Sequence, residues 1–145
     1  MTDGAPQSWT AASLAEALRS PELADEFAVE RIDGSEDVLR VSMPAQGDLS
    51  IFLSVAGEQI VVSTLLWPVD EQQDAPAFNA FLLKAQKLVP LSNFGIATVD
   101  GRDFYELFGE LATTSPLDTV VIELRALAEN AIEAATDLRA NFAPA

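Results

Sequence analysis

The 145-residue sequence contains no cysteine and no histidine. Without them the chain cannot form disulfide bonds, thiolate nucleophiles, Cys/His metal sites or Ser-His-Asp triads. A reducing compartment suits such a chain. Carboxylate or magnesium chemistry stays open, but nothing in the sequence points to it. We therefore expect no enzymatic activity and no cofactor.

Basic residues are few, with 8 Lys and Arg against 23 Asp and Glu, a formal net charge of −15. Binding to nucleic-acid phosphates or to an anionic membrane requires a positive surface, so both partners are disfavoured. Acidity favours solubility and attraction to basic segments of another protein. A mimic of nucleic acid would need its acids in rows, whereas here they are spread along the chain.

Long hydrophobic runs are also missing, since the densest apolar stretches have the length of a strand and a membrane helix needs about 20 residues. Met1 to Ser8 lacks the basic and apolar regions of a signal peptide. These features predict a cytoplasmic protein without direct membrane insertion. The length fits one domain, expected over residues 8–142, with flexible termini at 1–7 and 143–145.

Alternating apolar residues predict six strands, at residues 27–32, 38–43, 49–56, 59–67, 94–99 and 103–111. Helical spacing predicts a short helix capped by Ser8 or Thr10, a second helix that runs from its N-cap Asp74 to about Val89, and a third that runs from its N-cap Ser115 to about Phe142. The short connections indicate antiparallel pairing. We expect an α+β fold of order α-ββββ-α-ββ-α, in which helices pack on a four-strand meander plus a hairpin.

The third predicted helix has about 27 residues, or about 40 Å, and exceeds the body of a small domain. Apolar residues repeat along it at the 4-3 spacing of a coiled-coil seam: Leu117, Val121, Leu124, Ala128, Ala131, Ala135, Leu138 and Phe142. The seam could lie entirely on the chain's own sheet, or part of it could contact a partner or a second copy. Phe52 joins this candidate surface, because it falls on the polar face of its strand.

Other motifs have structural interpretations. Trp9 and Trp67 are expected to anchor packing, and the only lysines, Lys84 and Lys87, complement the dipole of the second helix. Gly-rich phosphate loops are absent. The role of the acidic loop from Asp70 to Asp74 is open. A small-molecule sensor or carboxylate enzyme remains the alternative function, and it predicts acids inside a pocket between the sheet and the second helix.

Several short motifs resemble the YjfI family of uncharacterised bacterial proteins over nearly the whole chain: Ile60–Trp67, Phe78-Asn79, Pro90-Leu91-Ser92 with Gly95, Gly101 with Tyr105, Phe108-Gly109, and Leu127-Ala128-Glu129-Asn130. The family tends to have Phe-Gly-Ala-Leu-Ser where this chain reads Phe-Gly-Glu-Leu-Ala from Phe108. Asn79 and Asn130, amides near apolar helical stripes, are expected to form structural hydrogen bonds.

The order of elements also resembles the fold of type III secretion chaperones and of YbjN-like proteins, which are small, acidic, often dimeric binding proteins. Genes of the YjfI family tend to lie beside those of phage-shock-protein-A-like membrane-remodelling proteins. Together the resemblances imply a non-catalytic, chaperone- or adaptor-like accessory. Its partner would be such a protein, a second copy, or both.

Overall fold

The computed structural model describes residues 8–32, 37–47 and 49–139. Its α-helices are α1 (Ala11–Leu18), α2 (Ala75–Ala85) and α3 (Leu117–Glu133), and its strands are β1 (Ala28–Arg31), β2 (Val38–Met43), β3 (Leu49–Ala56), β4 (Gln59–Pro68), β5 (Asn93–Val99) and β6 (Arg102–Ala112). Short 3₁₀ turns η1 (Pro44–Gln46), η2 (Val69–Glu71) and η3 (Gln86–Leu88) separate them, and the π-helical segment η4 (Ala134–Arg139) extends α3.

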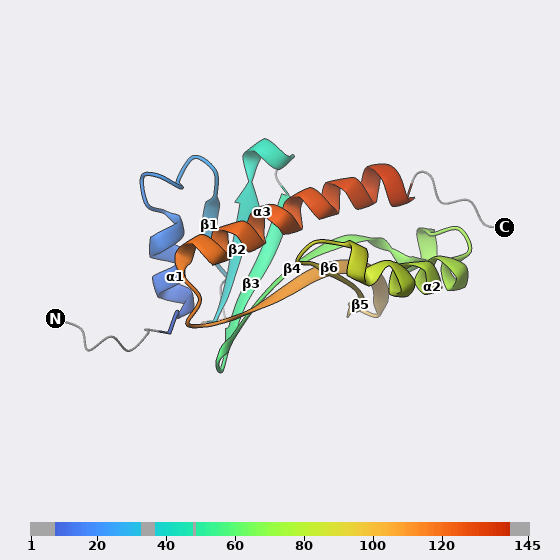
Figure 1. Ribbon diagram of the computed structural model, residues 1–145, viewed down its shortest axis with the longest axis horizontal. Coiled ribbons are helices and arrows are strands. Elements are labelled where there is room, and N and C mark those ends of the chain that lie inside the picture. The colour runs from blue at the N-terminus through green and yellow to red at the C-terminus, as the bar shows by residue number, and fades with distance from the viewer. Residues whose placement is uncertain (1–7, 33–36, 48, 140–145) are drawn as a thin grey trace.

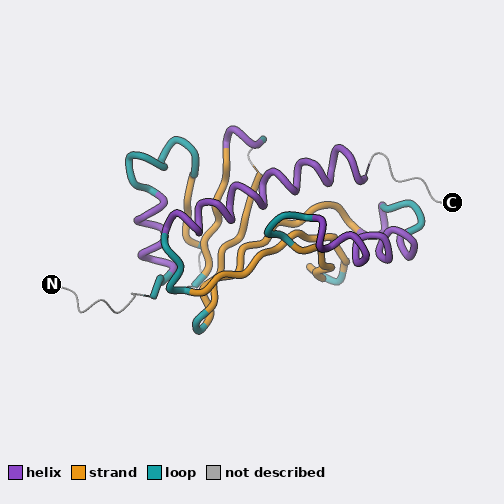
Figure 2. Tube along the Cα trace, viewed as in Figure 1, coloured by secondary structure: helices purple, strands orange, loops and turns teal. Residues whose placement is uncertain are grey.

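All six strands form one antiparallel sheet of order β1-β2-β3-β4-β6-β5. The first four strands are a meander, and the β5–β6 hairpin folds back so that β6 pairs with β4 and β5 becomes an edge (Figure 1). Figure 2 shows the strong twist of this sheet and the long helix that crosses it. The predicted α+β fold and order of elements are confirmed.

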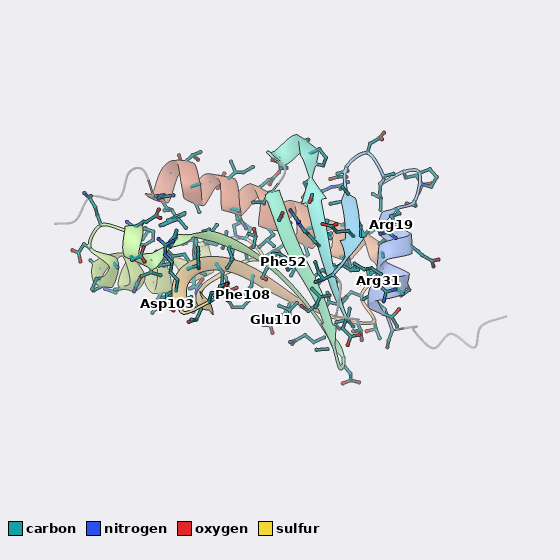
Figure 3. The ribbon with its side chains drawn as sticks, turned by 180° about the vertical axis from the view of Figure 1, so that it is seen from behind. Arg19, Arg31, Phe52, Asp103, Phe108 and Glu110 are labelled. Atoms are coloured by element: carbon teal, nitrogen blue, oxygen red, sulfur yellow. The ribbon has the colours of Figure 1, made fainter. Side chains whose placement is uncertain are left out.

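One face of the sheet carries the core. Strand alternation places Leu39, Ile51, Val62 and Leu107 on that face, and each of these side chains is fully buried. The helices cover it with their own apolar stripes, which include Leu14 and Leu18 of α1, Phe78 and Leu82 of α2, and Leu124, Leu127 and Ala128 of α3. The opposite face has no helix over it among the described residues (Figure 3).

The turns follow the residue types that the sequence offers. Asp100 and Gly101 both have positive φ, 51° and 78°, as a two-residue hairpin turn requires, so the predicted β5–β6 hairpin is confirmed. Gly57 closes the β3–β4 turn at φ 61°. The predicted Asp33-Gly34 turn lies outside the described residues.

The helix ends differ in detail from those expected. Thr10 and Asp74 are side-chain N-caps as predicted, but the prediction that Ser115 caps α3 is wrong, since Pro116 occupies that position without a side-chain bond. The carbonyl of Ser115 instead accepts a hydrogen bond from Trp9 Nε1 at 2.7 Å. The α-helical part of α2 ends at Ala85, four residues early, and continues as η3.

The third helix runs over the sheet from α1 to α2 (Figure 1). Arg125 pairs with Glu26 beyond the α1 end, at 2.7 Å. At the other end, Arg139 pairs with Glu71 at 3.0 Å and lies over the ring of Trp67, 5.1 Å from its centroid. Trp67 is buried and Trp9 packs against the core, which confirms both tryptophans as packing anchors.

Candidate protein-binding surfaces

Most of the predicted helical seam lies inside the molecule. Val121, Leu124, Ala128 and Ala131 are buried against the chain's own sheet, and Leu117 and Leu138 are half-buried against the same core. Ala135 is exposed, and Phe142 lies outside the described residues. The alanines let the helix approach the sheet closely. The chain's own sheet therefore takes the place that a partner helix would have in a coiled coil. The exposed apolar residues of α3 lie elsewhere, at Ile122 and Ile132.

Phe52 lies on the uncovered face of the sheet, with 37% of its surface exposed. Phe52 belongs to a row of residues that lie opposite one another on neighbouring strands. From β1 to β5 across the sheet, the row reads Glu30, Arg40, Phe52, Ser63, Phe108, Asn93. Neighbouring strands are about 4.8 Å apart, so Phe52 and Phe108 stand about 10 Å apart with only a serine between them. Figure 3 shows both rings on this face. We call Phe52, Val61, Leu65, Phe104 and Phe108 the uncovered apolar face.

Polar groups lie beside and within the uncovered apolar face. Arg40 donates to Ser50 Oγ at 3.2 Å and pairs with Glu30 at 3.3 Å on the β1 side. Glu106 lies within the face, between Phe104 and Phe108 on β6 and opposite Leu65 and Gly95, and burial among these neighbours raises the pKa of its carboxyl. Aromatic side chains mixed with hydrogen-bonding polar groups are an ordinary composition for a protein–protein interface.

Gly95 allows the Phe108 ring to lie flat against β5. A Cβ at Gly95 would come within 3.1 Å of Phe108 Cε1 and 3.3 Å of Glu106 Oε1. A larger residue at this position would therefore have to displace the Phe108 ring or the Glu106 carboxylate.

A second apolar surface, which the sequence analysis did not single out, lies over α2, η3 and β5. Its exposed side chains include Leu83 and Leu88, which are 70% and 82% exposed, and Phe81, Leu91 and Ile96. Lys84 and Lys87 lie among them, exposed and without an ion pair between described residues. Leu83 falls outside the apolar stripe of the second predicted helix, and that was the signal available in the sequence. The same stripe was expected to include Phe81 and Leu88, and the structure leaves both exposed.

A cavity of about 210 Å³ opens between α2 and β5, at the place where the alternative function requires a pocket. Its lining is apolar apart from two polar side chains, Asn79 and Tyr105, and contains no acid among the described residues: Asn79, Leu82, Leu83, Phe94, Gly95, Ile96 and Tyr105. The Tyr105 hydroxyl donates to Asn79 Oδ1 at 2.6 Å, and burial raises the pKa of this hydroxyl. Asn79 therefore has the structural bond that was expected.

Asn130 also makes structural bonds. Its amide donates to the carbonyl of Pro90 at 2.8 Å and to Ser92 Oγ at 2.9 Å, so α3 fastens the segment that leads into β5. Seven residues before it, Glu123 is 6% exposed and packs on Gly109, where any Cβ would collide with the carboxylate. No described group forms a hydrogen bond with its Oε2, and burial raises the pKa of the Glu123 carboxyl.

The acidic loop has a structural role. Asp70 and Glu71 both accept hydrogen bonds from Arg102, at 2.8 and 3.1 Å, which tie η2 to the β5–β6 hairpin. The guanidinium lowers the pKa of Asp70. Asp74 caps α2. In the described part of the chain no three Asp or Glu side chains converge as metal ligands, and no helix there is long and apolar enough to cross a membrane.

Comparison with solved structures places the fold among known ones. YbjN from E. coli superposes with a TM-score of 0.67 over 90% of this chain and 94% of that chain, at 10% identity. A chain of the ExsC–ExsE complex superposes with a TM-score of 0.55 over 89% and 92%, at 14% identity. The predicted likeness to YbjN-like proteins and type III secretion chaperones is confirmed at the level of the fold.

Sequence comparison gives the closer relation. The uncharacterized protein YjfI of Escherichia coli, from strain K12 and from O157:H7, is 35% identical over 130 residues, which cover 88% of this chain and 92% of YjfI. Residues 8–142 match DUF2170, described as an uncharacterized protein conserved in bacteria. The chain therefore belongs to the DUF2170 family and is a relative of YjfI.

Proposed function

We propose that this protein is a non-catalytic, chaperone- or adaptor-like accessory of the cytoplasm that binds another protein through the uncovered apolar face. The observation that carries the proposal is the row in which Phe52 and Phe108 flank Ser63 on a sheet face without a covering helix. Large aromatic side chains near the centre of a contact often contribute a large share of the binding energy at protein interfaces.

Three further observations support a binding role. The groups whose pKa is raised by burial, Glu106, Glu123 and Tyr105, lie at separate places and do not share one pocket. The cavity beside α2 is apolar, and its two polar side chains bond to each other. In the ExsC–ExsE complex, a chain with this fold is bound to a second protein.

The proposed partner is a phage-shock-protein-A-like protein, on the basis of the gene neighbourhood that the family resemblance implies. Self-association into a homodimer is part of the same proposal. The net charge of −15 favours a partner that presents basic residues around an apolar contact.

The test is affinity purification of the tagged protein from its native cell, followed by binding measurements with the captured protein and with the phage-shock-like neighbour. Phe52→Ser should weaken binding at least tenfold, because it removes a central aromatic contact. Ile122→Ser is the matched control, since Ile122 is similarly exposed but lies on the outer side of α3.

Capture of no protein by the wild-type chain would contradict the binding role. Equal loss with both variants, or loss with Ile122→Ser alone, would show that the uncovered apolar face is not the contact. Capture of a different protein that depends on Phe52 would contradict only the phage-shock assignment.

A further inference from the structure

Strand β5 presents a short free edge. The N–H of Phe94 donates to Gln86 Oε1 at 2.7 Å, and the carbonyl of Phe94 accepts from Gln86 Nε2 at 2.8 Å. These groups point away from β6, so strand alternation turns those of Ile96 and Thr98 outward as well. Among the described strands β5 pairs only with β6. The edge is therefore open at Ile96 and Thr98, and at Phe94 the side-chain amide of Gln86 occupies it.

Apolar side chains stand beside this open edge. Ile96 is 49% exposed on the helix side of the sheet, and Leu83 of α2 stands over it across the 210 Å³ cavity. Unpaired edge groups together with exposed apolar side chains form a template for another strand.

The two ends of the edge carry opposite charge. Lys87 follows Gln86, whose side chain bonds Phe94, so the exposed Lys84 and Lys87 lie near the first half of β5. Asp100 and Asp103, both exposed, lie at the hairpin tip that ends β5. All other basic side chains are arginines that have interaction partners, among them Arg19, Arg40, Arg102, Arg125 and Arg139.

We propose that a second copy of this chain occupies the β5 edge, so that two sheets join antiparallel about a twofold axis that passes between the two copies of Ala97. Ile96 of each protomer then lies opposite Thr98 of its partner, and the outward groups of these residues form about four hydrogen bonds. This inference specifies the self-association included in the proposed function and does not depend on who the other partner is.

Self-complementarity favours a second copy over an unrelated strand. In this register Asp100 lies opposite Phe94 of the partner, next to the partner's lysines, so unlike charges meet at both ends of the junction. Elsewhere two chains of charge −15 repel each other. The α2 helices of both copies lie on the same side of the joined sheet, where Leu83 and Ile96 become buried.

Analytical ultracentrifugation of the full chain tests the proposal. The wild type should sediment as a dimer of the 15.5 kDa chain. Thr98→Pro should raise the dimer dissociation constant at least tenfold, because proline has no N–H to donate across the junction. The monomer should still fold, since the N–H of Thr98 points outward at the sheet edge and makes no bond within the described part of the chain. Thr98→Val is the matched control and should stay dimeric, since it loses only the hydroxyl that donates to Asp103.

A second variant guards against misfolding of the proline chain. Lys84→Glu combined with Lys87→Glu changes only exposed groups and should also yield monomers with an unchanged circular dichroism spectrum. A monomeric wild type would overturn the proposal, as would a dimer that survives both the proline and the lysine changes.

The outcome is separable from that of the proposed function. Phe52→Ser should remain dimeric. A monomeric wild type whose partner capture depends on Phe52 would overturn the β5 dimer and leave the binding role intact. Loss of partner capture by Thr98→Pro in a monomeric protein would show that the edge takes a strand of the partner instead.

Discussion

Glu123 has a buried carboxylate whose hydrogen bonding is incomplete. Its Oε2 has no hydrogen-bond partner among the described groups, and Gly109 provides the space into which it packs. Burial without a partner disfavours the charged form, which raises the pKa of the group. A carboxyl with a raised folded-state pKa stabilises the fold fully below its unfolded pKa and loses that contribution as pH rises through the folded pKa.

We predict that Glu123→Gln raises the free energy of unfolding by about 1 kcal/mol at pH 7.5, because the amide removes an unpaired buried charge at constant shape. Urea unfolding of both proteins measures the difference, which should shrink to zero as pH falls below the ordinary glutamate pKa. Glu129→Gln, on the exposed side of the same helix, should change stability little. A destabilised Glu123→Gln chain at pH 7.5 would mean that the carboxylate has a favourable charge partner.

At the scale of the element, α3 shows how one pattern serves two environments. The 4-3 spacing of its apolar residues is the same for a helix that packs on its own sheet and for one that packs on a partner. Burial separates the two cases, since Ala128 is fully buried while Ala135, one heptad later, is exposed. Arg139 holds the last described turn down on Trp67 and Glu71.

The same substitution at these two alanines should therefore have unequal effects. Ala128→Leu should lower the free energy of unfolding by about 1–3 kcal/mol, because it forces extra methylene groups between helix and sheet. Ala135→Leu should change it by less than about 0.5 kcal/mol. Urea unfolding of both variants measures the contrast. Equal effects at the two positions would contradict an internal seam in this part of α3.

At the scale of the whole molecule, the charge is far from balanced. The chain has 23 acidic and 8 basic residues, and the ion pairs of its arginines are mostly exposed. Exposed pairs contribute little, whereas unpaired acids repel one another over the surface. Self-repulsion should therefore dominate the electrostatic response of the fold.

We predict that the melting temperature rises by a few degrees when NaCl increases from about 0.01 M to about 0.15 M, as the Debye length falls from about 30 Å to about 8 Å. The rise should diminish near pH 4.5, where many carboxylates take up protons. Calorimetry at both pH values measures it, with sucrose as a non-ionic control. A melting temperature that falls with salt would show that the exposed ion pairs outweigh repulsion.

Local chemistry made much of the fold predictable. Alternation set the strands, with β2 and β3 at the predicted bounds, and the Asp100-Gly101 turn formed the β5–β6 hairpin. The exposed position of Phe52 could be inferred, because strand period alone assigns it to the face opposite Leu53. The start of α3 could not be inferred, because Ser115 does not cap the helix and its carbonyl accepts the hydrogen bond from Trp9, a contact between segments far apart in the sequence.

By itself, the sequence determined the order and type of the elements, the charge, and the missing cysteine and histidine chemistry, since these depend only on residue type and local spacing. The tertiary structure decided which surfaces remain free. It buried most of the α3 seam, left the face around Phe52 without a covering helix from the described part of the chain, and made β5 an edge by pairing β6 with β4. The physical reason is that an apolar stripe determines which side of an element must be buried. Which other element buries that side, and which sides stay exposed, depends on how the whole chain packs.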